Sequence, residues 1–276
     1  MHCSPTPAMI PKRNTPLRRF TEFALSSALL IAFGCAAPNG SADTRLAVSN
    51  VDESPAAALS RQGSEYVLGD ATIDGIGKYY MGREISHVMG HLGAGWLERD
   101  TREQEERTDL LLDFLFRQDA GVVADIGVGT GYFALPWAQR LPEGRVLGVD
   151  IQPEMLDILT TRAQQSRLSN VEPILGKIDD PNLPPGEVDV VLIVDAYHEF
   201  SHPREMMAGI VRGLTPGGRV VLVEYRGEDA FVPIKELHKM TEEQAILELA
   251  AVGLEWVATE DFLPQQHVLV FRKPSS

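Results

Sequence analysis

The chain has 276 residues, with 25 lysines and arginines against 39 aspartates and glutamates, which gives a formal net charge of −14. This acidic balance disfavours a nucleic-acid partner, because neutralising phosphates requires clustered basic side chains. Cys3 and Cys35 are its two cysteines. Their N-terminal position excludes a disulfide framework, a cysteine-ligated zinc site and a cysteine nucleophile in the rest of the chain. The length suits one α/β domain with extensions.

The first 35 residues have the order of a secretory signal peptide. A basic stretch over 12–19 precedes an apolar run over 24–33, and Cys35 follows directly after Gly34. The apolar run is too short to span a bilayer as a permanent helix. The sequence A-F-G-C at 32–35 resembles a bacterial lipobox, in which the cysteine is acylated. We therefore predict an exported lipoprotein anchored on the periplasmic side of a membrane, or a cytoplasmic protein if the signal is not used.

The next segments are a tether and a helical region. Residues 36–65 lack helical or strand periodicity, which predicts a flexible tether. Two helices are expected within 66–119, over 83–96 and 101–117. His87 and His91 stand four residues apart on the first of these helices, among apolar residues. We interpret that face as a packed surface rather than a metal site.

From residue 121 onward, predicted strands and helices alternate. The strand at 188–195 is an almost continuous run of valine, leucine and isoleucine, typical of a central parallel strand buried on both faces. The alternation predicts an α/β fold with a doubly wound sheet that binds ligands at the carboxyl ends of its strands. The strands are expected at 122–125, 145–150, 171–175, 188–195, 219–225, 254–259 and 267–272, and the helices at 132–140, 153–167, 203–214 and 241–252.

A glycine-rich loop follows the first strand of this region. Residues 125–131 read D-I-G-V-G-T-G, and glycine is needed where a chain turns sharply or a ligand approaches bare backbone. The second strand ends at Asp150, whose carboxylate can accept both hydroxyls of a ribose. Tyr132 stands where a dinucleotide fingerprint requires glycine or alanine. This tyrosine disfavours a nicotinamide-dependent oxidoreductase.

The glycine loop, Asp150, Asp195 and the L-T-P-G-G-R turn at 214–219 together resemble the class I S-adenosylmethionine-dependent methyltransferases. The likeness covers about 120–272 and is nearest to small-molecule enzymes of the ubiquinone-biosynthesis type. It implies a seven-stranded Rossmann-like sheet whose last strand is antiparallel. It also implies that 66–119 forms a helical cap over S-adenosylmethionine.

The resemblance further implies cofactor-binding roles. The loop glycines would lie against the aminocarboxypropyl group, Asp150 would hold the ribose hydroxyls, and Asp195 would face the methionine end. The acid that contacts adenine normally lies after the third strand, where this chain reads G-K-I-D-D at 176–180. Lys177 occupies the usual acid position, so Asp179 or Asp180 would take that role. The residues implied at the cofactor are Asp125, Gly127, Gly129, Gly131, Asp150, Ile151, Ile178, Asp179 and Asp195.

Methyl transfer requires an oriented nucleophile, and a base if the nucleophile loses a proton. The candidates follow the fourth strand: Tyr197, His198 and Glu199. We expect His198 to be the base or to orient the acceptor, with Glu199 fixing its ring; otherwise His198 only closes the loop through hydrogen bonds. The expected acceptor is a small organic molecule with an oxygen or carbon nucleophile. The 66–119 cap and 231–240 would line its pocket.

Two other functions compete with this interpretation. Residues 198–202 read H-E-F-S-H, the spacing of a zinc hydrolase, but that spacing works only on a helix and Pro203 disfavours one. No metal site is therefore predicted. The second alternative is a non-catalytic, membrane-tethered module that binds the cofactor or a partner. It arises because S-adenosylmethionine is made in the cytoplasm, whereas the predicted signal directs the chain outward. Apart from the N-terminal anchor, no membrane contact is expected.

Overall fold

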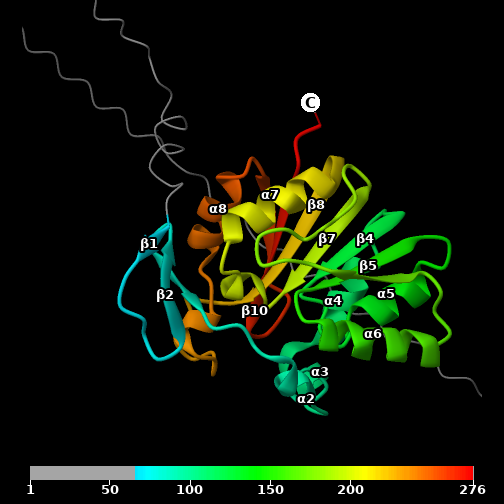
Figure 1. Ribbon diagram of the computed structural model, residues 1–276, viewed down its shortest axis with the longest axis horizontal. Coiled ribbons are helices and arrows are strands. Elements are labelled where there is room, and N and C mark those ends of the chain that lie inside the picture. The colour runs from blue at the N-terminus through cyan, green and yellow to red at the C-terminus, as the bar shows by residue number, and fades with distance from the viewer. Residues whose placement is uncertain (1–65, 276) are drawn as a thin grey trace, which may run out of the picture. The chain divides into compact units, whose positions relative to one another are not determined.

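The computed structural model describes residues 66–275 of the chain (Figure 1). The predicted signal peptide at 1–35 and the predicted tether at 36–65 lie outside these residues, so both remain predictions. Within 66–275, no helix combines the length and the apolar character needed to cross a membrane.

A seven-stranded sheet forms the centre of this structure, in the order β6-β5-β4-β7-β8-β10-β9. Neighbouring strands from β6 to β8 pair in parallel, whereas β10 pairs antiparallel with both β8 and β9. This arrangement confirms the predicted doubly wound α/β sheet with an antiparallel last strand. The chain order reverses between β4 and β7, the kind of switch point at which open α/β sheets bind ligands. The strands are β4 Val122–Ile126, β5 Arg145–Asp150, β6 Val171–Leu175, β7 Val188–Val194, β8 Leu214–Tyr225, β9 Glu255–Glu260 and β10 Gln266–Arg272.

Helices cover both faces of the large sheet (Figure 1). On one face, α7 and α8 pack against strand residues that include Ile193 and Leu222. On the other, α4, α5 and α6 pack against the alternate residues, including Leu192 and Val221. Because successive strand residues point to opposite faces, a strand covered on both sides is apolar throughout. The helices are α4 Thr108–Leu115, α5 Ala134–Arg140, α6 Pro153–Gln165, α7 Pro203–Gly213 and α8 Glu242–Ala250.

The segment before the large sheet begins with a small antiparallel sheet, β1-β2-β3. The helix predicted over 83–96 is wrong, because its first residues form β3 and only short helices follow. Met81 and Gly82 have φ values of 49° and 93°, and this tight turn brings β3 back onto β2. The predicted helical cap is therefore a small sheet followed by short helices. These elements are β1 Val67–Leu68, β2 Gly75–Tyr80, β3 Arg83–Ser86, the 3₁₀ helix η1 His91–Gly93, α2 Ala94–Leu97 and α3 Arg102–Glu106.

The single helix predicted over 101–117 is interrupted. Arg107 adopts a left-handed φ of 54°, so α3 ends before it and α4 begins after it. The Arg107 guanidinium pairs with the Asp109 carboxylate at 2.8 Å across the break. The two helices consequently pack as separate short elements.

After residue 120 the predicted elements agree closely with the structure. The strands at 145–150 and 171–175 have the predicted bounds, and the other strands and helices differ mainly at their ends. The largest difference is β8, which begins at Leu214 instead of at residue 219. Gly217 has a φ of 78° inside this segment, so the predicted turn persists as an irregularity of the strand. Two 3₁₀ helices, η2 Tyr197–Glu199 and η3 Glu236–His238, complete the structure.

Candidate active site

A cavity of about 540 Å³ lies at the carboxyl ends of β4, β5 and β7. Residues from both predicted parts of the site line it. Gly127, Gly129 and Asp150 belong to the predicted cofactor-binding part, and His198 and Glu199 belong to the predicted catalytic part. The segment before the large sheet and the segment at 231–240 also contribute lining residues. From these segments come Ile76, Met89, Leu97, Arg102, Ile234 and His238.

The glycine loop approaches its neighbours too closely for side chains. Gly127 and Gly129 have φ values of 74° and 52°, and a Cβ atom on either would lie less than 3 Å from a carbon of Ala196 or Leu97. Both glycines line the cavity. Gly131 does not line it: a Cβ there would lie 2.5 Å from Leu159 of α6. Glycine is therefore required there for close packing of the loop against that helix, and its predicted contact with the cofactor stays a prediction.

Asp150 ends β5 and supports the loop. One carboxylate oxygen accepts a hydrogen bond from the backbone N–H of Gly129 at 3.0 Å, and the other accepts from the N–H of Gln152 at 2.9 Å. Burial raises the pKa of Asp150, and these backbone donors oppose the shift. A carboxylate has about four acceptor positions, so Asp150 can accept hydrogen bonds beyond those from the backbone.

Asp125 lies beneath the loop and is only 4 % exposed. It does not line the cavity, so it can act on a ligand only by holding the loop. Burial, followed by the negative charge of Asp150, raises the pKa of Asp125 to about 7.

Asp195 follows β7 with a left-handed φ of 47° and lines the cavity. Its Oδ2 atom accepts a hydrogen bond from the Gln266 amide at 2.7 Å, whereas its buried Oδ1 has no partner among residues 66–275. Burial, and then the charges of Glu106 and Glu224, raise the pKa of Asp195. A buried acceptor without a donor is costly, so this site fits a ligand that carries a donor group.

The predicted adenine region is apolar where it meets the cavity. Ile151 and Ile178 line the cavity and expose 36 % and 53 % of their surface, so they offer apolar faces to a flat ring. Asp179 and Asp180 do not line it, and Asp180 instead accepts the backbone N–H of Asn182 at 3.0 Å. Neither aspartate reaches the cavity wall, so their proposed contact with adenine finds no support in this arrangement.

His198 is held by a glutamate that the sequence analysis missed. Its Nδ1 lies 2.6 Å from Oε2 of Glu224, which is fully buried at the end of β8. The other oxygen of Glu224 accepts the backbone N–H groups of Tyr197 at 3.0 Å and His198 at 3.3 Å. The prediction that Glu199 fixes this ring is therefore wrong. The sequence feature that could have identified Glu224 is its charge within the otherwise apolar run V-V-L-V-E-Y.

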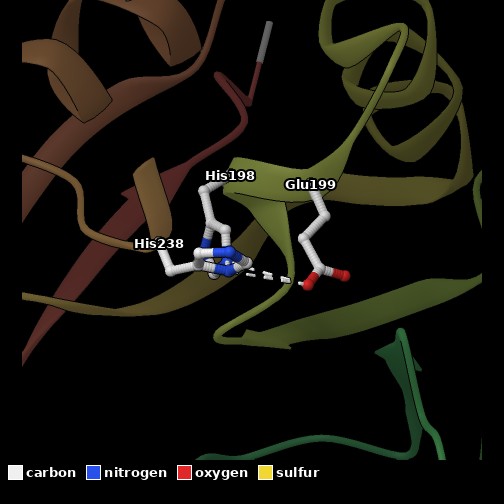
Figure 2. A group of neighbouring side chains, drawn as sticks. All are labelled: His198, Glu199 and His238. Atoms are coloured by element: carbon white, nitrogen blue, oxygen red, sulfur yellow. Dashed lines mark hydrogen bonds and ion pairs between the residues drawn. The ribbon is translucent and has the colours of Figure 1, made fainter. Parts of the chain in front are cut away.

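The free side of the His198 ring faces two further polar groups. Figure 2 shows the rings of His198 and His238 and the carboxylate of Glu199 turned toward one another. Nε2 of His198 is 3.1 Å from Nδ1 of His238, and Oε1 of Glu199 is 3.9 Å from each of these nitrogens. Burial lowers the pKa of His238 and raises that of Glu199. All three residues line the cavity.

Tyr197 does not lie at the cavity wall with His198, Glu199 and His238. It is buried outside the cavity lining, and its hydroxyl donates to Oε2 of Glu248 at 2.8 Å. Glu248 also receives both arms of the Arg83 guanidinium, at 2.9 and 3.0 Å. Burial raises the pKa of Tyr197. This placement contradicts the predicted catalytic role and makes Tyr197 part of the support beneath η2.

The zinc-hydrolase spacing at 198–202 is not realised. His198 lies in η2, Phe200 is extended with ψ of 112°, and His202 directly precedes α7. The Nδ1 atom of His202 instead lies 3.0 Å from Oγ of Ser201. The two histidines of the motif therefore share no helical face, and His202 does not line the cavity.

Residues 123–218 match a family model described as a methyltransferase domain. The chain is 33 % identical over 103 residues to a demethylmenaquinone methyltransferase of Deinococcus radiodurans, covering 37 % of this chain and 42 % of that protein. It is 33 % identical over 113 residues to the nocamycin O-methyltransferase of Saccharothrix syringae, covering 41 % of this chain and 40 % of that protein. The chain thus spans less than half the length of these two curated relatives.

The fold also matches solved structures. A S-adenosylmethionine-dependent methyltransferase from Aquifex aeolicus superposes with a TM-score of 0.61 at 20 % identity, over 67 % of this chain and 99 % of that one. The matching region contains the glycine loop and Asp150, which border the cavity. Residues 123–218 therefore match a methyltransferase domain, and the chain has the fold of an S-adenosylmethionine-dependent methyltransferase.

Proposed function

We propose that this protein transfers a methyl group from S-adenosylmethionine to a small organic acceptor with an oxygen or carbon nucleophile. The observation that carries the proposal is a single cavity of about 540 Å³ bordered by both parts of the site. Gly127, Gly129 and Asp150 supply the cofactor side, and His198 and Glu199 supply polar groups for chemistry. Because both sets line one space, a bound cofactor and an acceptor would meet there.

The residues around the cavity fit the chemical groups of S-adenosylmethionine. Bare backbone at the loop admits a close ligand, and the Asp150 carboxylate has acceptor positions left for ribose hydroxyls. The partnerless Oδ1 of Asp195 suits the ammonium group of the methionine end. Ile151 and Ile178 offer apolar faces to adenine. When bound, the cofactor supplies a methyl group already activated by its sulfonium.

The protein's own task is to orient the acceptor and manage its proton. Glu224 accepts the Nδ1 proton of His198, so a neutral ring keeps its lone pair on Nε2, the atom toward Glu199 and His238. That atom is suited to receive a proton from an acceptor hydroxyl or to orient the acceptor. Met89 and Leu97 from the cap and Ile234 from the 231–240 segment line the cavity, so they would limit the access of water to the reacting groups.

The lining favours a small, partly apolar acceptor. Apolar side chains from the cap and from 231–240 form much of the wall, including Val88, Met89, Trp96, Leu97 and Ile234. The two similar proteins above are named for a quinone precursor and for an O-methylation, which supports ring-bearing acceptors with oxygen or carbon nucleophiles. Cys3 and Cys35 are the chain's two cysteines, so thiolate-dependent arsenite methylation is disfavoured.

Calorimetry followed by a label-transfer assay tests the proposal. We expect the full-length protein to bind S-adenosylmethionine and S-adenosylhomocysteine, and not a nicotinamide dinucleotide. Incubation with methyl-labelled cofactor and a panel of phenols, quinols and enols should then yield a labelled product detectable by mass spectrometry. Absence of cofactor binding would refute the proposal. Binding without labelling of any acceptor would favour the non-catalytic module instead.

A further inference from the structure

Three potential metal ligands meet at the wall of the cavity, although the sequence predicted none. The ligand atoms are Nε2 of His198, Nδ1 of His238 and Oε1 of Glu199, and all lie within 4.8 Å of one another (Figure 2). His238 is far from the other two in sequence and reaches them only because η3 packs near η2. The set consists of two imidazoles and one carboxylate.

The distances suit one shared ion. Two ligand atoms at about 2.1 Å from a metal lie about 3.0 Å apart at a right angle and about 3.4 Å apart in a tetrahedron. The two nitrogens, at 3.1 Å, are already within that range. The carboxylate oxygen is 3.9 Å from each nitrogen, so it must approach by roughly half an ångström. A side-chain rotation of Glu199 supplies such a movement.

The surrounding groups also match those of a metal-binding histidine. A ligating imidazole usually donates its other N–H to a carboxylate, which fixes its tautomer and direction. Glu224 accepts from Nδ1 of His198 at 2.6 Å and is itself anchored by two backbone N–H groups.

The charges that face the cluster favour a cation. Glu199 adjoins both rings, and Glu224 lies behind the His198 ring. The cations on the η3 segment are Lys235, whose ammonium pairs with the Asp74 carboxylate, and Lys239, whose ammonium pairs with the Glu236 carboxylate. Carboxylates therefore outweigh ammonium groups around the three ligand atoms.

We propose that His198, Glu199 and His238 bind one divalent transition-metal ion at the cavity wall. Two imidazoles and a carboxylate are a ligand set suited to Zn²⁺ or Fe²⁺, and three protein ligands leave open positions. These positions face the cavity, so an acceptor would bind the ion through an oxygen atom; this last step rests on the proposed methyl transfer. His198 would then orient the acceptor through the ion instead of acting as the base.

Metal titration of the full-length, chelator-treated protein tests the site. We expect one equivalent of Zn²⁺ to bind by calorimetry, and Co²⁺ to give visible absorption bands typical of nitrogen and oxygen ligands. His198→Ala and His238→Ala should each weaken Zn²⁺ binding by more than tenfold. Glu224→Gln should weaken it about tenfold, because it disturbs only the ligand's support. His202→Ala, outside the cluster, is the matched control and should bind like the wild type.

The outcomes separate this proposal from the proposed function. Absence of stoichiometric Zn²⁺ binding, or binding that survives both cluster variants, refutes the metal site. In that case the 3.1 Å contact between the two histidines is a hydrogen bond of a proton relay. S-adenosylmethionine binding is measured in the same variants. Cluster variants that lose Zn²⁺ binding but still bind S-adenosylmethionine support the metal site. A wild-type protein that binds Zn²⁺ but no S-adenosylmethionine refutes the proposed methyl transfer and leaves the metal site standing.

Discussion

Nδ1 of His198 lies 2.6 Å from Oε2 of Glu224, with the two side chains 3 % and 0 % exposed. This contact links the loop after β7 to the end of β8, the neighbouring parallel strand. Because Glu224 also accepts two backbone N–H groups of η2, it sets both the ring direction and the position of the turn that carries the ring. Glu224 is therefore a positioning residue for the chemistry at His198.

Glu224→Gln keeps the shape of the side chain but allows the amide nitrogen to face Nδ1. We expect methyl-transfer turnover to fall by about tenfold to a hundredfold, because an amide N–H facing Nδ1 favours the tautomer of His198 with its proton on Nε2. The affinity for S-adenosylmethionine should stay within about twofold. Nitrogen NMR of the labelled histidine should show the proton on Nδ1 in the wild type and a mixture in the variant. An unchanged tautomer with reduced turnover would contradict this role.

Asp150→Ala should abolish most cofactor binding. The variant removes the acceptor for ribose hydroxyls and also the bond that Oδ2 receives from Gly129 N–H. We expect the dissociation constant for S-adenosylmethionine to rise by more than about tenfold, since a charge-assisted hydrogen bond contributes about 1.5–3 kcal/mol. Asp157→Asn, on the exposed side of α6, is the control. Equal affinities for Asp150→Ala and wild type would remove the ribose assignment.

Asp125 should make the folded protein less stable as the pH rises toward neutrality. Burial raises its pKa to about 7, against about 3.9 in an unfolded chain. Between these values the folded protein binds more protons than the unfolded chain, so this contribution is complete below about pH 4 and is lost as the pH passes through 7. Asp125→Asn removes the ionisable group. The variant should therefore exceed the wild type in melting temperature by more at pH 8 than at pH 4.5.

The control for this prediction is the wild type measured over the same pH range. Asp150 and Asp195 also have pKa values raised by burial, so they add to the slope in both proteins. The difference between the two melting curves isolates Asp125. A difference that does not grow with pH would show that this carboxyl ionises normally.

The large sheet and the cofactor side of the site were predictable because their signals are local. A strand buried on both faces, such as β7, needs a continuous apolar run, and the loop after β4 needs glycine at tight positions. The segment before the sheet was not predictable in the same way. Its turn at Met81 and Gly82 decides between helix and hairpin, and methionine is an unusual residue at a left-handed φ.

The polar side of the cavity was only half predictable. His198 and Glu199 stand directly after β7, where chemistry is expected in an α/β sheet. Glu224 and His238 reach them only through the pairing of β8 with β7 and the packing of η3 near η2. Local reasoning chose Glu199 as the ring partner because it is adjacent in sequence. Glu199 does face the ring, but at 3.9 Å from Nε2, whereas Glu224 at the end of the neighbouring parallel strand is 2.6 Å from Nδ1.

Cys35 is predicted to carry a lipid in the native protein. The apolar run before it and the A-F-G-C sequence support cleavage and acylation at this residue. Mass spectrometry of protein expressed in a bacterial host should find an acylated N-terminal Cys35, and the protein should sediment with membranes. Cys35→Ser should release it, whereas Cys3→Ser should have no effect. An intact N-terminus at Met1 in the purified protein would contradict the signal.

Tyr197 and Glu248 should prove to be supports of the site. Tyr197→Phe removes a 2.8 Å hydrogen bond to a buried carboxylate, which costs about 1.5–3 kcal/mol of unfolding free energy. Glu248→Ala should cost more, about 3–5 kcal/mol, because it leaves the Arg83 guanidinium unpaired in the interior. Arg83 also donates to the backbone carbonyl of His198 at 3.1 Å, so the larger loss should loosen η2. Denaturant unfolding measures both variants. If Tyr197→Phe keeps the stability of the wild type but loses methyl-transfer turnover, the Tyr197 hydroxyl takes part in the chemistry and the supporting role is contradicted.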